Sequence, residues 1–239
     1  MSDGTMSRMT IRNRPAYEAR VLLDEQTRPG SIRERRARCD EPHVGDLNTL
    51  ARSVSTEKGA SVPLVDPAGG GTRARVLMLM EEHVPCRSAG TGLVSLHAND
   101  PTAGNTMTAC ERAGLDYADL LLWQVIPWWS RDPGLARRCG RSPSRSEHAR
   151  LAGPYVVRLL ALLPQLEAVV LLGRGTQLAW DRAARSAGVS LAGEVRVMPC
   201  PHPSPMAWHM TDRASGRPNR DVTIGVLAEA ARRIHRPAH

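Results

Sequence analysis

Four short apolar runs, separated by segments with helical periodicity, constrain the fold of this chain more than any other feature. The runs are continuous rather than alternating and have the length of strands, at residues 75–81, 119–126, 168–173 and 195–198. Continuous apolar strands are typical of a parallel sheet covered on both faces. Helical patterns follow at 101–113, 146–163, 176–186 and 221–234. Because strand and helix alternate, we expect an α/β fold, a three-layer α/β/α sandwich around a central, mostly parallel, four-stranded sheet.

The remaining segments predict the domain organisation. Residues 1–14 are polar and without periodicity, which indicates a disordered N-terminus. Residues 15–60 carry helical patterns at 17–25 and 41–54, and we expect a helical extension packed on the core. An arginine-dense stretch at 31–38 separates these patterns and is either a solvated face or a grip on DNA. The α/β domain is expected at 61–239, since a chain of 239 residues suffices for one full-sized domain.

Composition limits the partners and cofactors that we expect. The net charge is +8, carried almost entirely by arginine, and it supports nucleic-acid binding only weakly because GC-rich coding sequence also favours arginine. The five cysteines form no Cys-x-x-Cys pair, so we expect no zinc site, no iron-sulfur cluster and no other cofactor. Their odd number, without a signal peptide, predicts reduced thiols in the cytoplasm. No apolar run is long enough to span a bilayer, so no membrane partner is expected.

Polar residues follow the carboxyl ends of the predicted strands, where open parallel sheets bind their ligands. These residues are Glu81, Glu82, Gln124, the Gly173-Arg174-Gly175 turn and the loop at 202–206. A carboxylate pair, an amide and a histidine are therefore expected at one rim. None of the glycine clusters has the spacing of a nucleotide-phosphate loop.

The loop after the last strand reads Cys-Pro-His-Pro-Ser-Pro-Met-Ala-Trp at 200–208. Each proline fixes its own φ and restricts the residue before it, so the loop holds His202 with little freedom. Such stiffness suits a side chain that must meet a ligand atom at a set distance. The His-Pro-Ser-Pro segment at 202–205 can also be a simple turn.

His202-Pro203-Ser204-Pro205 after a strand resembles the second motif of the uracil-DNA glycosylase superfamily. Other segments match in the same order, at 80–85, 90–95, 99–103 and 122–128, and the resemblance covers roughly residues 31–208. It implies a monomeric DNA glycosylase, not of the iron-sulfur type. Such an enzyme flips a nucleotide out of DNA and hydrolyses the N-glycosidic bond of uracil or of a damaged or modified base.

The resemblance also implies a role for each matching residue. The catalytic residues would be Glu81 and His202, with Glu82 as the alternative carboxylate. A cleaved base leaves as an anion and its sugar becomes cation-like, so the site needs a hydrogen-bond donor toward the base and a carboxylate toward the sugar. The base-binding residues would be Gln124, Leu93, Val94, Ser95 and Asn99. The DNA-binding residues would be Thr102, Arg174, Pro203, Ser204 and Met206, with Thr102 equally suited to capping a helix.

Three departures from the family pattern affect the expected base. His83-Val84 replaces a Pro-Gly or Pro-Tyr pair, Leu93 and Val94 stand where a stacking phenylalanine is usual, and Gln124 replaces an asparagine. These changes favour a base other than plain uracil, including a hypermodified base of phage DNA, which would make the protein an antiviral defence enzyme.

Two other classes of function remain open from the sequence. One is a catalytically weak, glycosylase-like protein that binds DNA. The other is an unrelated α/β hydrolase or nucleoside-cleaving enzyme that shares only the layered architecture.

Overall fold

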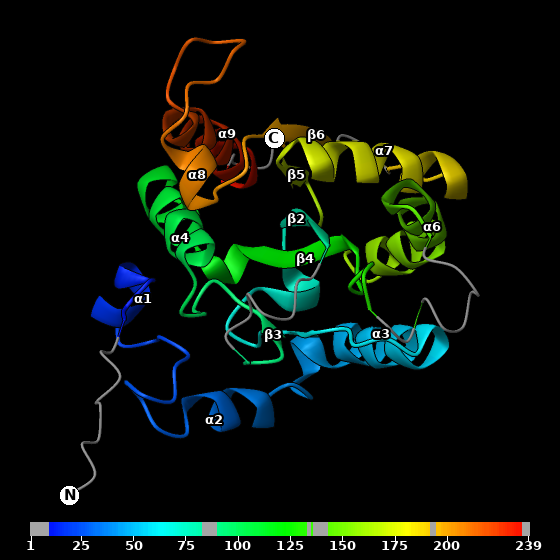
Figure 1. Cartoon of the computed structure of the whole chain (residues 1–239), viewed down its shortest axis with the longest axis horizontal. Coiled ribbons are helices and arrows are strands. Elements are labelled where there is room, and N and C mark those ends of the chain that lie inside the picture. The colour runs from blue at the N-terminus through cyan, green and yellow to red at the C-terminus, as the bar shows by residue number, and fades with distance from the viewer. Residues whose placement is uncertain (1–9, 83–89, 133–134, 136–142, 192–194, 236–239) are drawn as a thin grey trace, which may run out of the picture.

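A parallel sheet forms the centre of the molecule (Figure 1). A computed structural model of the chain describes residues 10–82, 90–132, 135, 143–191 and 195–235. The strands are β2 (Val76–Glu82), β4 (Leu120–Ile126), β5 (Ala168–Leu172) and β6 (Arg196–Cys200), in the order β4-β2-β5-β6. All three pairings are parallel, which confirms the predicted four-stranded sheet and makes it wholly rather than mostly parallel.

Apolar side chains cover both faces of the sheet. The register places Val76 between Leu120 and Ala168, and Leu79 between Trp123 and Leu171. All of these residues are buried, as continuous apolar strands require. Only β6, at the edge, shows exposed side chains, and it contains Pro199, which an edge strand tolerates.

Helices cover the sheet on two sides (Figure 1). On one side α6 (Arg145–Ala161) packs against α7 (Arg174–Ala187), and on the other α4 (Pro101–Ala113) packs against α9 (Asn219–Ile234). The bounds of α4 match the prediction, because Asp100 caps its first turn and Gly114, at φ 67°, ends it. None of the described helices combines the length and the apolar character needed to cross a membrane.

Three helices lie in the N-terminal region, α1 (Arg14–Glu18), α2 (Ser31–Ala37) and α3 (Pro42–Lys58). Helix α3 buries the face expected from its periodicity, including Val44, Leu47 and Val54. The helix predicted at 17–25 is wrong beyond Glu18, since Arg20 has a φ of 58° and Leu23 forms a parallel bridge with Ala98. The arginine-dense stretch, which lies between the two predicted helices, itself forms α2.

Residues 10–14 belong to the folded structure, although the sequence predicted disorder as far as residue 14. Asn13 is buried, its amide donates hydrogen bonds to the carbonyl oxygens of Leu96 and Ala98, and its oxygen caps α1. A polar segment without periodicity is thus held by hydrogen bonds to a distant part of the chain. Residues 1–9 lie outside the described residues.

A second, two-stranded sheet was not expected from the sequence. Strand β1 (Leu64–Val65) pairs in parallel with β3 (Leu93–Val94), beside short 3-10 helices at Gly71–Arg73 and Tyr117–Asp119. Two-residue strands carry too little pattern to detect. This small sheet brings the segment 93–98 next to the loop that follows β1.

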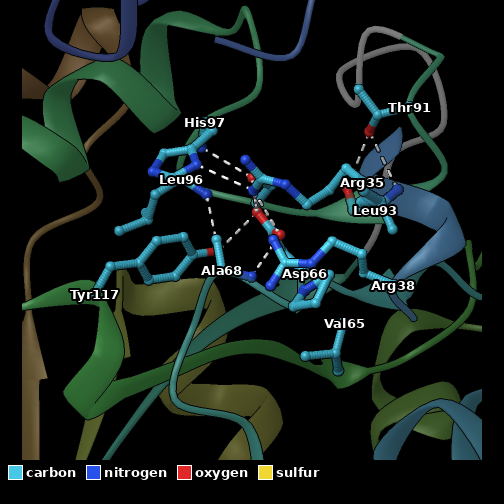
Figure 2. Close-up of polar contacts among 12 residues, drawn as sticks. Arg35, Arg38, Val65, Asp66, Ala68, Thr91, Leu93, Leu96, His97 and Tyr117 are labelled. Carbon is cyan, nitrogen blue, oxygen red and sulfur yellow. Dashed lines mark hydrogen bonds and ion pairs between the residues drawn. The ribbon is translucent and has the colours of Figure 1, made fainter. Parts of the chain in front are cut away.

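A buried carboxylate, Asp66, ties α2 to this segment (Figure 2). Arg35 Nη1 lies 2.8 Å from Asp66 Oδ1 and 3.0 Å from Oδ2, and the Asp66 side chain has no exposed surface. The hydroxyls of Ser95 and Tyr117 donate to Oδ2, and the backbone N–H of Ala68 donates to Oδ1. The charge is therefore both paired and hydrogen-bonded, the condition under which a buried charge is tolerated.

His97 joins the same network in its neutral form. Its Nδ1 lies 3.1 Å from Arg35 Nη1. Arginine can only donate hydrogen bonds, so Nδ1 accepts and Nε2 carries the ring proton. Burial lowers the pKa of His97 to about 4, with Arg35 acting in the same direction and Asp66 against both. Burial, reinforced by the Asp66 charge, raises the pKa of Tyr117 well above its usual value, so the phenol stays protonated.

His97 should make the protein less stable in mild acid. The unfolded chain binds a proton on this ring near pH 6.5 and the folded chain only near pH 4, so stability is full above pH 6.5 and falls as the pH drops toward 4. The loss from this residue should approach about 3 kcal/mol. Urea unfolding at pH 7 and pH 4.5 should show a smaller loss for His97→Asn, whose oxygen can still accept from Arg35. His209→Asn, at an exposed site, should behave like the parent, and equal losses in all three proteins would contradict the assignment.

Candidate active site

A cavity of about 300 Å³ opens where the carboxyl ends of β2, β4 and β5 meet the first turns of α4 and α7. It brings together nine of the residues singled out from the sequence, namely Glu81, Glu82, Leu93, Val94, Ser95, Thr102, Gln124, Arg174 and His202. Residues more than 120 positions apart in the sequence therefore share one cavity. This is the rim expected for a parallel sheet.

The His202 side chain is held in place from two directions. Its Nδ1 accepts a hydrogen bond of 3.0 Å from the backbone N–H of Ser204. Since a backbone N–H can only donate, the neutral ring carries its proton on Nε2. On the other side the ring packs on Gly173, where a β-carbon would lie 2.8 Å from His202 Cβ. Asn105 also donates to the carbonyl oxygen of Pro203 at 2.8 Å and fixes the loop to α4.

Glu81 and Glu82, the last two residues of β2, both line the cavity but differ in exposure and in their contacts. The Glu82 side chain is 6% exposed, and its Oε2 accepts the backbone N–H of Ser130 at 2.9 Å. That carboxylate therefore anchors the chain after β4. The Glu81 side chain is 27% exposed and lies against Gly175 at the start of α7. The arrangement favours Glu81 as the carboxylate available to a ligand.

Arg145, the first residue of α6, spans both carboxylates. Its Nη1 lies 3.7 Å from Glu81 Oε1 and its Nη2 lies 3.5 Å from Glu82 Oε1. Its side chain is about half exposed, so each pairing is weak. Among the described residues, no group of three or more His, Cys, Asp or Glu side chains could hold a metal ion.

Gln124 contributes a polar group without a protein partner to the cavity. The residue is 2% exposed, and its Oε1 has no hydrogen-bond partner within the described part of the chain. A buried polar atom left in this condition costs about 1–3 kcal/mol. An amide kept at that cost is a candidate for meeting a donor on a ligand.

The wall around Gln124 is largely aliphatic. Leu93 and Val94 of β3 form it together with Met80, Leu122 and Leu172. Ser95 also lines the cavity, but its hydroxyl donates to Asp66. The buried charge network thus fixes the orientation of this wall.

Asn99 does not lie where the resemblance implied. It is absent from the cavity lining, accepts the backbone N–H of Arg12, and donates to the Thr10 carbonyl oxygen and the Asp24 carboxylate. We therefore correct its role from base binding to anchoring the N-terminal segment. Thr102 lines the cavity, while the cap of α4 is provided by Asp100.

Of the predicted DNA-binding residues, Thr102 and Arg174 line the cavity, whereas Pro203, Ser204 and Met206 follow His202 in the chain and are not part of the lining. Arg174, the first residue of α7, is exposed. Helix α8 (Pro205–Trp208) begins after Ser204 and is anchored by the buried Trp208, so that Met206 is 82% exposed. Pro203 is buried and supports the loop. His83 and Val84 of the first motif lie outside the described residues.

Two contributions to the site were missed from the sequence. Thr106 lines the cavity from α4, but within a helical pattern it reads as an ordinary core position. Gly175 was noted only as part of a turn, and its contact with Glu81 depends on the packing of α7 against β2.

Comparison with known families gives one match. The model of the family described as "Uracil DNA glycosylase superfamily" matches residues 83–223, more than half of the chain. A comparison with curated proteins finds no match.

Replacing Gln124 by methionine should stabilise the protein. Methionine has a similar shape without the buried, unpartnered oxygen, so the free energy of unfolding should rise by about 1 kcal/mol. Urea unfolding measures the change. Gln177→Met is the matched control, because the Gln177 amide donates to the Cys200 carbonyl oxygen and its replacement should give no gain. A loss of stability in Gln124→Met would show that the amide is already satisfied.

Proposed function

Because this chain belongs to the uracil DNA glycosylase superfamily, we propose that it is a monofunctional DNA glycosylase that flips a nucleotide out of DNA and hydrolyses the bond between base and deoxyribose. One observation carries the proposal. Glu81, Gln124 and His202, from three separate parts of the sheet, line a single cavity. Its polar groups stand in an otherwise largely aliphatic wall, as in a site that takes a small, flat ligand.

His202 supports departure of the base. When the glycosidic bond breaks, its electron pair goes to the base, and an oxygen of the base becomes negative. The Nε2–H of His202 is suited to donate to that oxygen, and the Ser204 N–H on Nδ1 keeps the ring in the required tautomer. The donor is oriented before the reaction, so little reorganisation is needed as the charge develops.

Glu81 is suited to stabilise the positive charge that develops on the sugar. A carboxylate beside the cation-like deoxyribose stabilises it, and it can accept the proton of the water whose oxygen bonds to the sugar carbon. Gln124 would read an edge of the base, and Met206, exposed on α8, would occupy the space left in the duplex. Arg174 and Ser204 would contact phosphates.

The cavity wall favours the hypothesis that the substrate base is not plain uracil. Leu93 and Val94 offer aliphatic surface where a stacking ring is expected, and Gln124 is one methylene longer than asparagine. We therefore propose a damaged or modified base as the substrate, with uracil as the reference. Excision of a hypermodified base from phage DNA is the second candidate, and the aliphatic wall is the observation that favours it.

The proposal is tested with duplexes that carry a single uracil, xanthine, hypoxanthine or hydroxymethylcytosine, together with modified phage DNA. Abasic sites are counted after incubation with the purified protein. Release of any of these bases supports the proposal. DNA binding without release would identify a DNA-binding protein instead, and turnover of free nucleosides without DNA affinity would identify a nucleoside-cleaving enzyme.

His202→Ala should slow base release without weakening DNA binding. Losing one oriented donor to the leaving base should cost about 2 to 4 kcal/mol in the chemical step. Single-turnover rates and the Kd for a product duplex separate the two effects. His235→Ala, beyond the end of α9, should match the parent. An unchanged single-turnover rate would remove His202 from the mechanism.

Gln124→Asn should shift the preference among bases toward uracil. The shorter amide withdraws from a larger base, whereas asparagine is the usual residue at this strand position of the superfamily. The ratio of kcat/KM for uracil to that for the preferred base should rise by about tenfold, the effect of one gained or lost hydrogen bond. Identical ratios in parent and variant would show that Gln124 does not read the base.

A further inference from the structure

The turn between β5 and α7 contacts both of the side chains proposed to carry the chemistry. Gly173 lies next to His202, and Gly175 lies next to the Glu81 carboxylate. A β-carbon at 173 would lie 2.8 Å from His202 Cβ, and one at 175 would overlap Glu81 Oε2 and lie 3.0 Å from Glu81 Cδ. One short segment thus limits how both side chains sit.

The two glycines are required for different reasons. Gly173 has a φ of 94°, a backbone conformation that disfavours any side chain. Gly175 is the second residue of α7, and its φ is not among the positive values. Alanine is the better helix former at such a position. The helix backbone therefore gives no reason for glycine at 175.

Glu81 supplies that reason. The three heavy atoms nearest to a β-carbon at 175 all belong to the Glu81 carboxyl group. The steric demand at Gly175 therefore comes from the position of one carboxylate.

The contact places the carboxylate against the first turn of a 14-residue helix. The N-cap residue, Gly173, has no side chain to cap the N–H groups of that turn, and the positive end of a helix dipole favours an anion. Oε2 faces Gly175, and Oε1 lies 3.7 Å from Arg145 Nη1. The carboxylate is thus confined between α7 and α6.

We propose that Gly175 is a positioning residue for Glu81. Without a β-carbon at 175, the carboxylate rests on the first turn of α7, at the place from which it serves the deoxyribose of the flipped nucleotide. This inference rests on the proposed glycosylase activity. It adds that the chain gives up a more stable helix residue in order to seat this carboxylate.

Gly175→Ala should lower kcat at least tenfold while KM and the affinity for product DNA stay near the parent values. The displaced carboxylate no longer faces the sugar, but the surfaces that hold DNA are unaltered. In a Glu81→Ala background the same substitution should change the residual single-turnover rate less than twofold. A kcat equal to the parent's, or an equal loss in both backgrounds, would overturn the proposal.

Gly225→Ala is the matched control. Gly225 lies inside α9, is exposed, and has nothing within 4 Å of the place of a β-carbon. The substitution should raise the urea midpoint, as alanine does in a helix, and leave kcat unchanged. A fall in kcat here as large as that of Gly175→Ala would show that the lower kcat does not come from displacement of the Glu81 carboxylate.

The positioning of Glu81 by Gly175 can also be tested without measuring activity. Gly175→Ala should raise the urea midpoint more in the Glu81→Ala protein than in the parent, because only the parent has a carboxylate in the way. Equal shifts would overturn the inference even in an active enzyme. If the parent releases no base while the shifts in urea midpoint differ as expected, the contact between Gly175 and Glu81 is supported and the glycosylase proposal fails.

Discussion

The ion pair between Arg35 and Asp66 is the contact on which the cavity wall depends. It joins α2, from the N-terminal region, to the loop after β1, and through Ser95 it fixes the segment that carries Leu93 and Val94. A fully buried carboxylate is tolerated only while its partners stay in place, so each donor around Asp66 restrains the others. The N-terminal region is therefore part of the architecture of the site rather than an appendage. Asn13 and Asn99 reinforce this link with hydrogen bonds across more than 80 residues of sequence.

The site itself combines a rigid frame with a polar group that is not satisfied within the described part of the chain. The frame comes from the parallel sheet, the proline-rich loop and the two glycines before and within α7. Within it, the buried Gln124 Oε1 has no hydrogen-bond partner among the described residues, and Glu81 is confined beside the exposed Arg145. An unsatisfied polar group weakens a folded protein, so the Gln124 oxygen in this cavity is a physical argument for a ligand that satisfies it.

Much of the architecture could be predicted from the sequence, because the central strands and α4 carry strong local signals. The continuous apolar runs predicted the strands, and helical periodicity predicted α4 at 101–113. The motif order led to Glu81, Gln124 and His202, which do share one cavity. What failed depended on contacts distant in sequence. Asn99 lies within a motif, but its side chain is hydrogen-bonded to Arg12 and Asp24. Strands β1 and β3 are too short to show a period. The contact of Gly175 with Glu81 exists only once α7 packs against β2.

The position of Glu81 and Glu82 at the end of β2 links strand pairing to chemistry. Both carboxylates line the cavity and approach Arg145, but Glu82 also accepts the Ser130 N–H, whereas Glu81 lies against Gly175. Shifting β2 by a single residue against β4 would leave its apolar part between two apolar layers but would move both carboxylates away from these contacts. A one-residue insertion or deletion in this strand would therefore displace both carboxylates together, whereas a substitution changes one side chain.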